Sequence, residues 1–349
     1  MARSQRSKSN IVTIRSVAER AGVSAMTVSN VVNSRGRVGE ETAAAVRKAI
    51  EELGYTPNVA ARNLASAAPT RVGLIYTNEQ TPFLDSILVG VLKATTARGL
   101  QLIIRDSPSY AQADAENALR GLVYSGADAL LLIPPYAEIV ANTPRAVSGR
   151  LPAAAIATGR SMEGIFTVRI DNRRAIRDMV RLLVAKGHRR IGYIGGHAAH
   201  SDASERRVGF EEGLREAGIS MAPELIFQGD FLYPSGEAAG SALLGLADRP
   251  TAIISANDDM AAGLIAQAHR MGLRLPDDLA VTGFDDTAPA RRLWPPLTTI
   301  RQPVGEMAFR AAEMLIEALQ SPRGEIVCRD VVIEHELIER ESTSRPPAR

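Results

Sequence analysis

Residues 14–33 read IRSVAERAGVSAMTVSNVVN, and this stretch decides the fold of the N-terminal part of the chain. Its apolar residues recur at helical spacing, and the small residue Ala18 allows two helices to approach closely. Gly22 can adopt the positive φ that ends a first helix, and Ser24 can cap the N-terminus of a second one. The stretch therefore predicts two short helices joined at a sharp angle, which is a helix-turn-helix.

The expected exposed face of the second helix is small, polar and uncharged, and such a helix fits the major groove of DNA. The residues on this face are Ala25, Met26, Thr27, Ser29, Asn30 and Asn33. Lysine and arginine outnumber acidic residues over residues 1–71, whereas the whole chain has a formal net charge of only +2. Because contacts with phosphates require such a basic excess, the pattern favours sequence-specific DNA binding over a generic helical hairpin.

A third helix is expected over about residues 40–53, where apolar residues again recur at helical spacing. Its expected inner face consists of Ala44, Val46, Ala49, Ile50 and Leu53. This helix would close a three-helix core, so we expect a DNA-binding headpiece over residues 1–56. Residues 57–70 are expected to form a short hinge helix and a linker. Within them, Leu64 is either an ordinary packing residue or an apolar wedge for a minor-groove base step.

Length and composition restrict the class of protein. A chain of 349 residues has room for two or three domains, and no apolar run approaches the length of a membrane span. The first nine residues are basic and lead into no long apolar segment, so a secretory signal is not expected. The lone Cys328 excludes an intramolecular disulfide and a multi-cysteine zinc site. We therefore expect a cytoplasmic protein without a metal or cofactor.

Residues 13–66 resemble the headpiece and hinge helix of the LacI/GalR family of bacterial transcription regulators. The motifs that carry the resemblance are AGVS at 21–24, TVS at 27–29, VVN at 31–33, EET at 40–42, ELGY at 52–55, and PN at 57–58 followed by ARNL at 61–64. Their order and spacing match the family pattern without an obvious gap. The resemblance implies three groups of DNA-binding residues: those that read bases, those that hold the DNA backbone and those that enter the minor groove.

The resemblance implies that the bases are read by Ala25, Met26 and Asn30. The residues in positions that typically hold the DNA backbone are Thr13, Ser24, Thr27, Ser29, Asn33, Arg37, Thr42, Tyr55 and Asn58. Those in the minor-groove positions are Ala61 and Leu64. The family most often has arginine where this chain has Asn30. Because arginine suits a guanine edge and asparagine an adenine edge, we expect the operator to depart from the usual half-site at that position.

From residue 71 onward, apolar runs of strand length alternate with helical segments, and the scheme occurs twice. Such a pattern predicts buried parallel sheets in two doubly wound lobes with a cleft between them. This α/β pattern is similar to the family's effector and dimerisation domain, which has the fold of periplasmic sugar-binding proteins. We expect that domain over 71–340, with a tail over 341–349. The family's chain crosses between lobes three times, here near 187, 303 and 331. Lobe one would then comprise 71–187 and 304–331, and lobe two 188–303 and 332–340.

In doubly wound folds ligands bind at the carboxyl ends of the strands. Reading those ends along the chain gives as candidate effector-binding residues Asn78, Phe83, Asp171, Asp202, Arg206, Phe231, Asn257, Asp285 and Gln302. Amides, carboxylates, one guanidinium and aromatic rings suit a hydroxyl-rich small molecule, whose hydroxyls pair with the polar groups and whose sugar face stacks on a ring. For any one of them the alternative is a helix cap or an ion pair. His197 and His200 lack a third ligand, so we do not expect them to bind a metal.

Three functions compete for this chain. A ligand-responsive repressor explains the headpiece, the hinge and the cleft together. It implies double-stranded operator DNA, a small effector and a homodimer as partners, since palindromic operators mirror a two-fold protein. A periplasmic-type solute-binding protein would explain only residues 71–340, and for an enzyme no catalytic constellation is evident. We expect a sugar or glycoside that releases the repressor from DNA at sugar-utilisation genes. A purine or nucleoside effector, and corepression, remain open.

Overall fold

The computed structural model describes residues 14–32, 39–53, 70–77, 81–143, 151–321 and 327–344. The chain divides into two compact units, Met1–Pro69 and Thr70–Arg349. The expected hinge helix over 57–70 lies almost entirely outside the described residues. Within the described part of the chain, no helix combines the length and apolarity that crossing a bilayer needs.

The first unit contains the predicted helix-turn-helix. Its helices are α1 (Ile14–Ala21), α2 (Ala25–Val32) and α3 (Glu40–Leu53). Gly22 has a φ of +67°, which ends α1 as expected, and the Ser24 hydroxyl accepts a hydrogen bond from the backbone N–H of Thr27 at 3.1 Å. This bond satisfies one of the free N–H groups in the first turn of α2.

The core of this unit is small and apolar. The buried residues that form it are Val17, Ala18, Val28, Val46 and Ala49. One predicted inner residue of α3 is wrong: Ala44 is exposed, whereas Ala43 is buried. The buried positions of α3 recur every three residues from Ala43, through Val46 to Ala49, and Ala44 lies one residue, about 100°, off that line.

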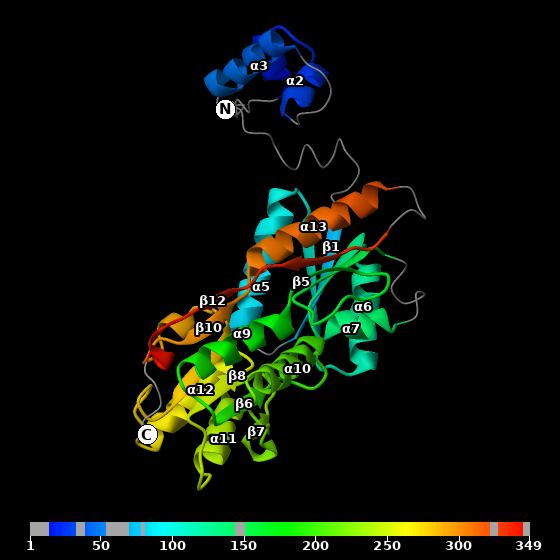
Figure 1. Cartoon of the computed structure of the whole chain (residues 1–349). Coiled ribbons are helices and arrows are strands. Elements are labelled where there is room, and N and C mark those ends of the chain that lie inside the picture. The colour runs from blue at the N-terminus through cyan, green and yellow to red at the C-terminus, as the bar shows by residue number, and fades with distance from the viewer. Residues whose placement is uncertain are drawn as a thin grey trace, which may run out of the picture. The chain divides into compact units, whose positions relative to one another are not determined.

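The second unit consists of two lobes, each built on a six-stranded sheet (Figure 1). The first sheet has the order β11-β5-β4-β3-β1-β2 and is parallel throughout. Its strands are β1 (Arg71–Thr77), β2 (Gln101–Ser107), β3 (Ala129–Leu132), β4 (Ala153–Ile156), β5 (Phe166–Ile170) and β11 (Asp330–Ile333). The central strands β3 and β4 are wholly buried, as the continuous apolar runs predict.

The second sheet has the order β12-β10-β9-β8-β6-β7, and only its edge strand β12 runs antiparallel to its neighbour. Its strands are β6 (Ile191–Gly195), β7 (Ile226–Gln228), β8 (Ala252–Ser255), β9 (Ala280–Asp285), β10 (Thr298–Arg301) and β12 (Glu336–Ile338). Two doubly wound sheets with crossover helices were predicted, and this fold class is confirmed.

Helices cover both sheets. Those packed on the first sheet are α5 (Pro82–Ala97), α6 (Gln112–Tyr124), α7 (Tyr136–Ala141) and α13 (Val304–Gln320). Those of the second lobe are α9 (Asn172–Ala185), α10 (Ser201–Glu216), α11 (Tyr233–Leu244) and α12 (Asp258–Arg270). Three short 3₁₀ turns complete the second lobe, η1 (Pro223–Leu225), η2 (Pro289–Arg291) and η3 (Glu341–Thr343).

The chain passes between the lobes at positions that differ in part from the expected ones. Helix α9 packs on α10 and also contacts β8 and β12, so the first passage follows β5, at Asp171, instead of residue 187. The second passage, between β10 and α13, lies at residues 302–303, close to the expected 303. The third falls between β11 and β12, at residues 334–335 instead of 331. An amphipathic helix between two sheets does not reveal by its pattern which sheet it covers.

The C-terminal boundary also differs. Residues 341–344 were expected in a tail, yet Ser342 and Thr343 are fully buried. The Ser342 hydroxyl donates to the Val281 carbonyl at 2.6 Å and accepts from the Thr298 N–H at 2.8 Å. These polar side chains pack a 3₁₀ turn against β9 and β10 without any apolar pattern, so hydrophobic periodicity could not reveal them.

Candidate functional site

The face of α2 expected to contact DNA is open in the structure. Met26 is 71% exposed, and Ala25, Thr27 and Asn30 are partly exposed. Ser24, at the start of α2, is exposed, and Thr42, at the start of α3, is partly exposed. The other DNA-binding predictions, or their side chains, lie outside the described residues: Thr13, Ser29, Asn33, Arg37, Tyr55, Asn58, Ala61 and Leu64.

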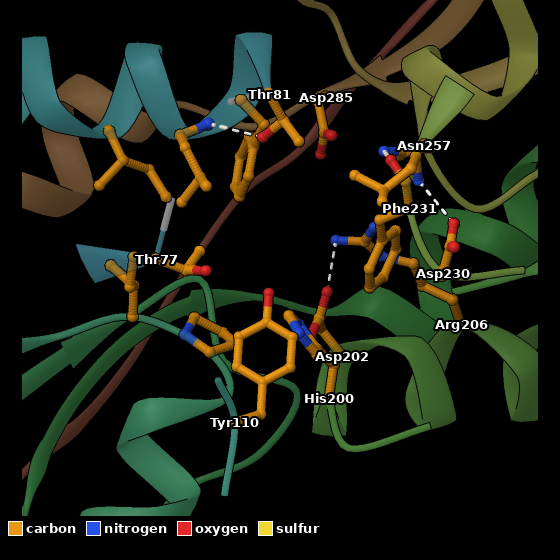
Figure 2. Close-up of a pocket in the computed structure, with 16 residues that line it drawn as sticks. Thr77, Thr81, Tyr110, His200, Asp202, Arg206, Asp230, Phe231, Asn257 and Asp285 are labelled. Atoms are coloured by element: carbon orange, nitrogen blue, oxygen red, sulfur yellow. Dashed lines mark hydrogen bonds and ion pairs between the residues drawn. The ribbon is translucent and has the colours of Figure 1, made fainter. Parts of the chain in front are cut away.

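A cavity lies between the two lobes of the second unit (Figure 2). The empty space between its lining atoms is about 600 Å³, a volume that includes solvent outside the cavity mouth. From lobe one it is lined by Thr77, Thr81, Phe83, Leu84, Ile87, Tyr110, Ile133 and Pro134. From lobe two it is lined by His200, Asp202, Arg206, Asp230, Phe231, Leu232, Asn257 and Asp285. The lobe-one wall is mostly apolar and the lobe-two wall mostly polar.

Arg206 is the centre of the polar wall. It projects from α10 and is only 1% exposed, and its Nε and Nη1 atoms donate to Asn172 Oδ1 at 2.9 Å and to the Ala256 carbonyl at 2.7 Å. Its Nη2 lies 3.1 Å from Asp202 Oδ2, one helical turn earlier (Figure 2). A guanidinium fixed at three points presents its remaining N–H groups in a fixed direction.

The two carboxylates near Arg206 differ in acidity. Burial is the largest single effect on Asp202 and disfavours its charged form, but the Arg206 guanidinium, His200 and a backbone hydrogen bond together outweigh it and lower the pKa of that carboxyl. Burial is also the largest effect on Asp285, and together with the nearby Asp258 it raises the pKa of Asp285 well above its usual range despite Arg206. The wall therefore combines a charged acceptor with a carboxyl that holds its proton more tightly.

Two cavity residues have backbone conformations that L-amino acids rarely adopt. Phe231 has a φ of +74° and Asp285 a φ of +111°, and each lies at the end of a strand or just after one. The Phe231 ring packs where any side chain at Gly196 would stand. Such strain is held in place by the surrounding fold and concentrates at binding sites.

Aromatic rings from both lobes also contribute to the cavity and its surroundings. Tyr110 makes edge-on contacts with His197 and His200, at 5.3 and 5.5 Å between ring centres. His200 also contacts the Phe231 ring at 5.1 Å, and Figure 2 shows the Tyr110 hydroxyl pointing into the cavity. These rings offer faces and edges on which a flat or ring-shaped ligand can pack.

Several buried polar atoms around the cavity lack hydrogen-bond partners among the described residues. Asp202 Oδ1 and His200 Nε2 belong to lining side chains. Gln302 Oε1 and Asn172 Nδ2 belong to the residues that hold Asp285 and Arg206. An unsatisfied buried polar atom costs about 1–3 kcal/mol, so a polar ligand that paired with these atoms would bind more favourably.

The structure brings together six of the nine predicted effector residues in the cavity lining: Phe83, Asp202, Arg206, Phe231, Asn257 and Asp285. Gln302 stands behind the lining, where its Nε2 donates to Asp285 Oδ1 at 2.7 Å. Asp171 is not among the lining residues and instead caps α9 by accepting from the Arg174 N–H at 2.9 Å. Asn78 lies outside the described residues.

Sequence reasoning missed several lining residues, chiefly Tyr110, His200 and Asp230. Asp230 immediately precedes a predicted residue, so reading one position further back would have found it. Tyr110 follows the end of β2 and required only the same strand-end rule. From the sequence we consider His197 and His200 only as metal ligands, so His200 is not among the predicted effector-binding residues. Among the described residues no group of three or more His, Cys, Asp or Glu side chains is placed to hold a metal.

Both units match known families. Residues 13–58 match the pattern described as "Bacterial regulatory proteins, lacI family", and residues 180–343 match a "Periplasmic binding protein-like domain". A relative from Pectobacterium carotovorum subsp. carotovorum (strain PC1), named HTH-type transcriptional repressor PurR, is 34% identical over 97% of this chain and 98% of its own length. A relative of the same name from Serratia proteamaculans (strain 568) is 35% identical over 97% and 98%.

Solved structures give the same result. A complex of the transcriptional regulator CelR with cellobiose superposes with a TM-score of 0.69 and 31% identity, covering 95% of this chain and 99% of that one. The lac repressor dimer bound to operator and the anti-inducer ONPF gives a TM-score of 0.70 and 27% identity over 95% and 99%. The chain belongs to the lacI family of bacterial regulatory proteins and is a ligand-responsive, DNA-binding transcriptional repressor.

Proposed function

We propose that the effector of this repressor is a neutral, hydroxyl-rich sugar or glycoside that binds in the cavity between the lobes. The observation that carries the proposal is the composition of the lobe-two wall. Asp202, Asn257 and Asp285 surround the fixed guanidinium of Arg206, and the Phe231 ring stands beside them. Carboxylates and amides that accept and donate at several positions suit vicinal hydroxyls, and a ring suits the apolar face of a sugar.

The lobe-one wall supports a ligand with two unlike faces. Phe83, Leu84, Ile87, Ile133 and Pro134 contribute only apolar side chains there. An apolar wall opposite a polar one fits a ligand that carries hydroxyls on one side and an apolar face or substituent on the other. A strongly anionic effector is disfavoured, because the single arginine of the lining already pairs with Asp202 and a further carboxyl group, Asp230, faces the cavity.

A purine is the second candidate, and the relatives favour it. The relatives named PurR and the CelR protein solved with cellobiose are 34% and 31% identical to this chain, so overall identity does not decide between the two ligand classes. A purine would stack between aromatic rings and offer few hydroxyls for Asp202, Asp230 and Asn257 to bind. The number of polar groups on the lobe-two wall supports the sugar.

We further propose that two copies of the chain bind a palindromic operator in the cytoplasm, where bacterial DNA is read. The solved lac repressor is a dimer on its operator. In this chain Val89 and Leu92 of α5 are 51% and 56% exposed, and apolar side chains exposed together favour an interface with a second copy. Ala25, Met26 and Asn30 would contact bases, and the exposed polar residues at the helix starts would contact phosphates.

The proposal is tested by fluorescence anisotropy of the full chain on the DNA upstream of its own gene, at fixed salt, with a panel of sugars, glycosides, purines and nucleosides. Nanomolar binding that one sugar or glycoside relieves would support the proposal. Relief or strengthening by a purine alone would replace the sugar with the second candidate. Weak binding that every compound leaves unchanged would contradict the proposal that the chain regulates this DNA.

A further inference from the structure

The first turn of α10 is capped by a residue of the opposite lobe. His200 stands at the N-cap position of α10, but its side chain makes no capping hydrogen bond. Instead Glu138 of α7, in lobe one, accepts through Oε1 from the Ser201 backbone N–H at 3.2 Å and from the Ser201 hydroxyl. A carboxylate at this position satisfies a free helix N–H and interacts favourably with the helix dipole.

A second lobe-one group completes the contact. The backbone N–H of Gly159 donates to the Ser201 hydroxyl oxygen at 2.9 Å. Gly159 approaches so closely that a side-chain carbon at this position would overlap the backbone of Ser201 and Asp202. Ser201 is therefore held from lobe one by a carboxylate and a backbone amide, and the three residues Glu138, Gly159 and Ser201 form what we call the lobe clasp.

The lobe clasp lies next to the effector cavity. Ser201 immediately precedes Asp202, and Arg206 follows one turn later on the same helix. Both of these residues line the cavity, whereas none of the three clasp residues does. Because the clasp joins the lobes, it exists only while the cleft is closed at this edge. Separating the lobes would return the Ser201 N–H, its hydroxyl and the Glu138 carboxylate to water.

We propose that Glu138 is a positioning residue for the effector site: by capping α10 from the opposite lobe, it makes closure of the cleft and placement of Asp202 and Arg206 a single event. Only the consequence for effector binding rests on the proposed function, in which the cavity is the effector site. The clasp itself acts in the ligand-free chain, and its test therefore needs no effector.

The test is amide hydrogen exchange, followed by mass spectrometry, on the full chain without ligand. Glu138→Ala should speed exchange at the Ser201 and Gly159 amides at least about tenfold, the effect expected for loss of a hydrogen bond to a charged group. Glu138→Gln, which keeps an acceptor oxygen, should restore most of the protection. Ser201→Ala should expose the Gly159 amide but leave the residue-201 amide protected by Glu138.

Two controls make the result decisive. Glu163→Ala changes an exposed lobe-one glutamate outside the clasp, and Ser204→Ala changes an exposed serine of α10; both should leave the two amides protected as in the parent chain. Unchanged exchange in Glu138→Ala would overturn the proposal. So would faster exchange spread evenly over lobe two, because that would show general destabilisation. If Glu138→Ala does not fold, the contrasting patterns of Glu138→Gln and Ser201→Ala decide the question.

Discussion

The guanidinium carbon of Arg206 lies 3.7 Å from the centre of the Phe284 ring. The Phe231 ring lies on the cavity side at 5.7 Å, so the cation is held by rings as well as by hydrogen bonds. Cation–π contacts gain strength in a desolvated setting such as this one. Arg206 is thus fixed before any ligand arrives, and the effector does not have to order it.

The first prediction concerns the buried ion pair. Arg206→Ala should lower the free energy of unfolding by about 3 kcal/mol or more, because it leaves the Asp202 carboxylate buried without its countercharge. The double variant Asp202→Asn with Arg206→Ala should lose less than the two single changes combined. Urea unfolding of the four proteins measures this coupling. Strictly additive losses would mean that the pair does not interact in the folded chain.

The second prediction separates cavity carboxylates from capping ones. Asp202→Asn removes a charged acceptor from the lobe-two wall and should weaken the response to the effector by at least about tenfold. Asp171→Asn is the matched control, since asparagine caps a helix as well as aspartate does and Asp171 is not a lining residue. The concentration of effector that half-relieves operator binding is the quantity to measure. Equal effects of the two substitutions would show that Asp202 does not contact the effector.

Sequence patterns predicted the architecture because buried strands and helical periodicity are local signals. They also predicted four of the nine polar residues that line the cavity, since strand ends converge at one edge of a sheet. They failed where the information is three-dimensional. The lobe to which α9 belongs depends on its packing against α10, and burial of Ser342 depends on strands far away in the chain. The contact of Glu138 with Ser201 joins residues 63 positions apart and has no sequence signature.

The third prediction is a pH dependence that arises at Asp258. This carboxyl is 1% exposed and accepts hydrogen bonds from the Thr287 N–H, the Thr287 hydroxyl and the Thr299 hydroxyl. Burial nevertheless raises its pKa to about 7. Between about pH 4 and pH 7 the folded chain therefore keeps a proton that the unfolded chain has lost, so this group's contribution to stability falls as pH rises through that window.

Asp258→Asn removes this titration while keeping the shape of the side chain. The stability of the parent chain relative to the variant should fall by up to about 4 kcal/mol between pH 4 and pH 8. Urea unfolding of both proteins across that range measures the difference. Parallel stability curves would show that Asp258 has the same pKa in the folded chain as in the unfolded chain.

The fourth prediction contrasts two helical glycines. A side chain at Gly209 of α10 would overlap the backbone of Arg173 on α9, whereas the space around Gly305 of α13 is open within the described residues. Gly209→Ala should therefore destabilise the chain by about 1–3 kcal/mol through forced separation of the two helices. Gly305→Ala should stabilise it by about 0.5 kcal/mol, because alanine loses less conformational freedom in a helix. Thermal unfolding compares the two, and the same sign for both would contradict this packing.

The fifth prediction concerns Asn30, a partly exposed residue of α2. If Asn30 reads a base edge, Asn30→Arg should shift the preferred base at one symmetric operator position from adenine to guanine, because arginine pairs with the guanine O6 and N7 atoms. Binding-site selection on both proteins shows the shift. Salt dependence distinguishes the alternative. An arginine that reached a phosphate would steepen the log–log slope by about 0.9 per contact and tighten binding to all sequences alike. A changed base preference with an unchanged slope would place residue 30 on a base, and a steeper slope with an unchanged preference would place it on the DNA backbone.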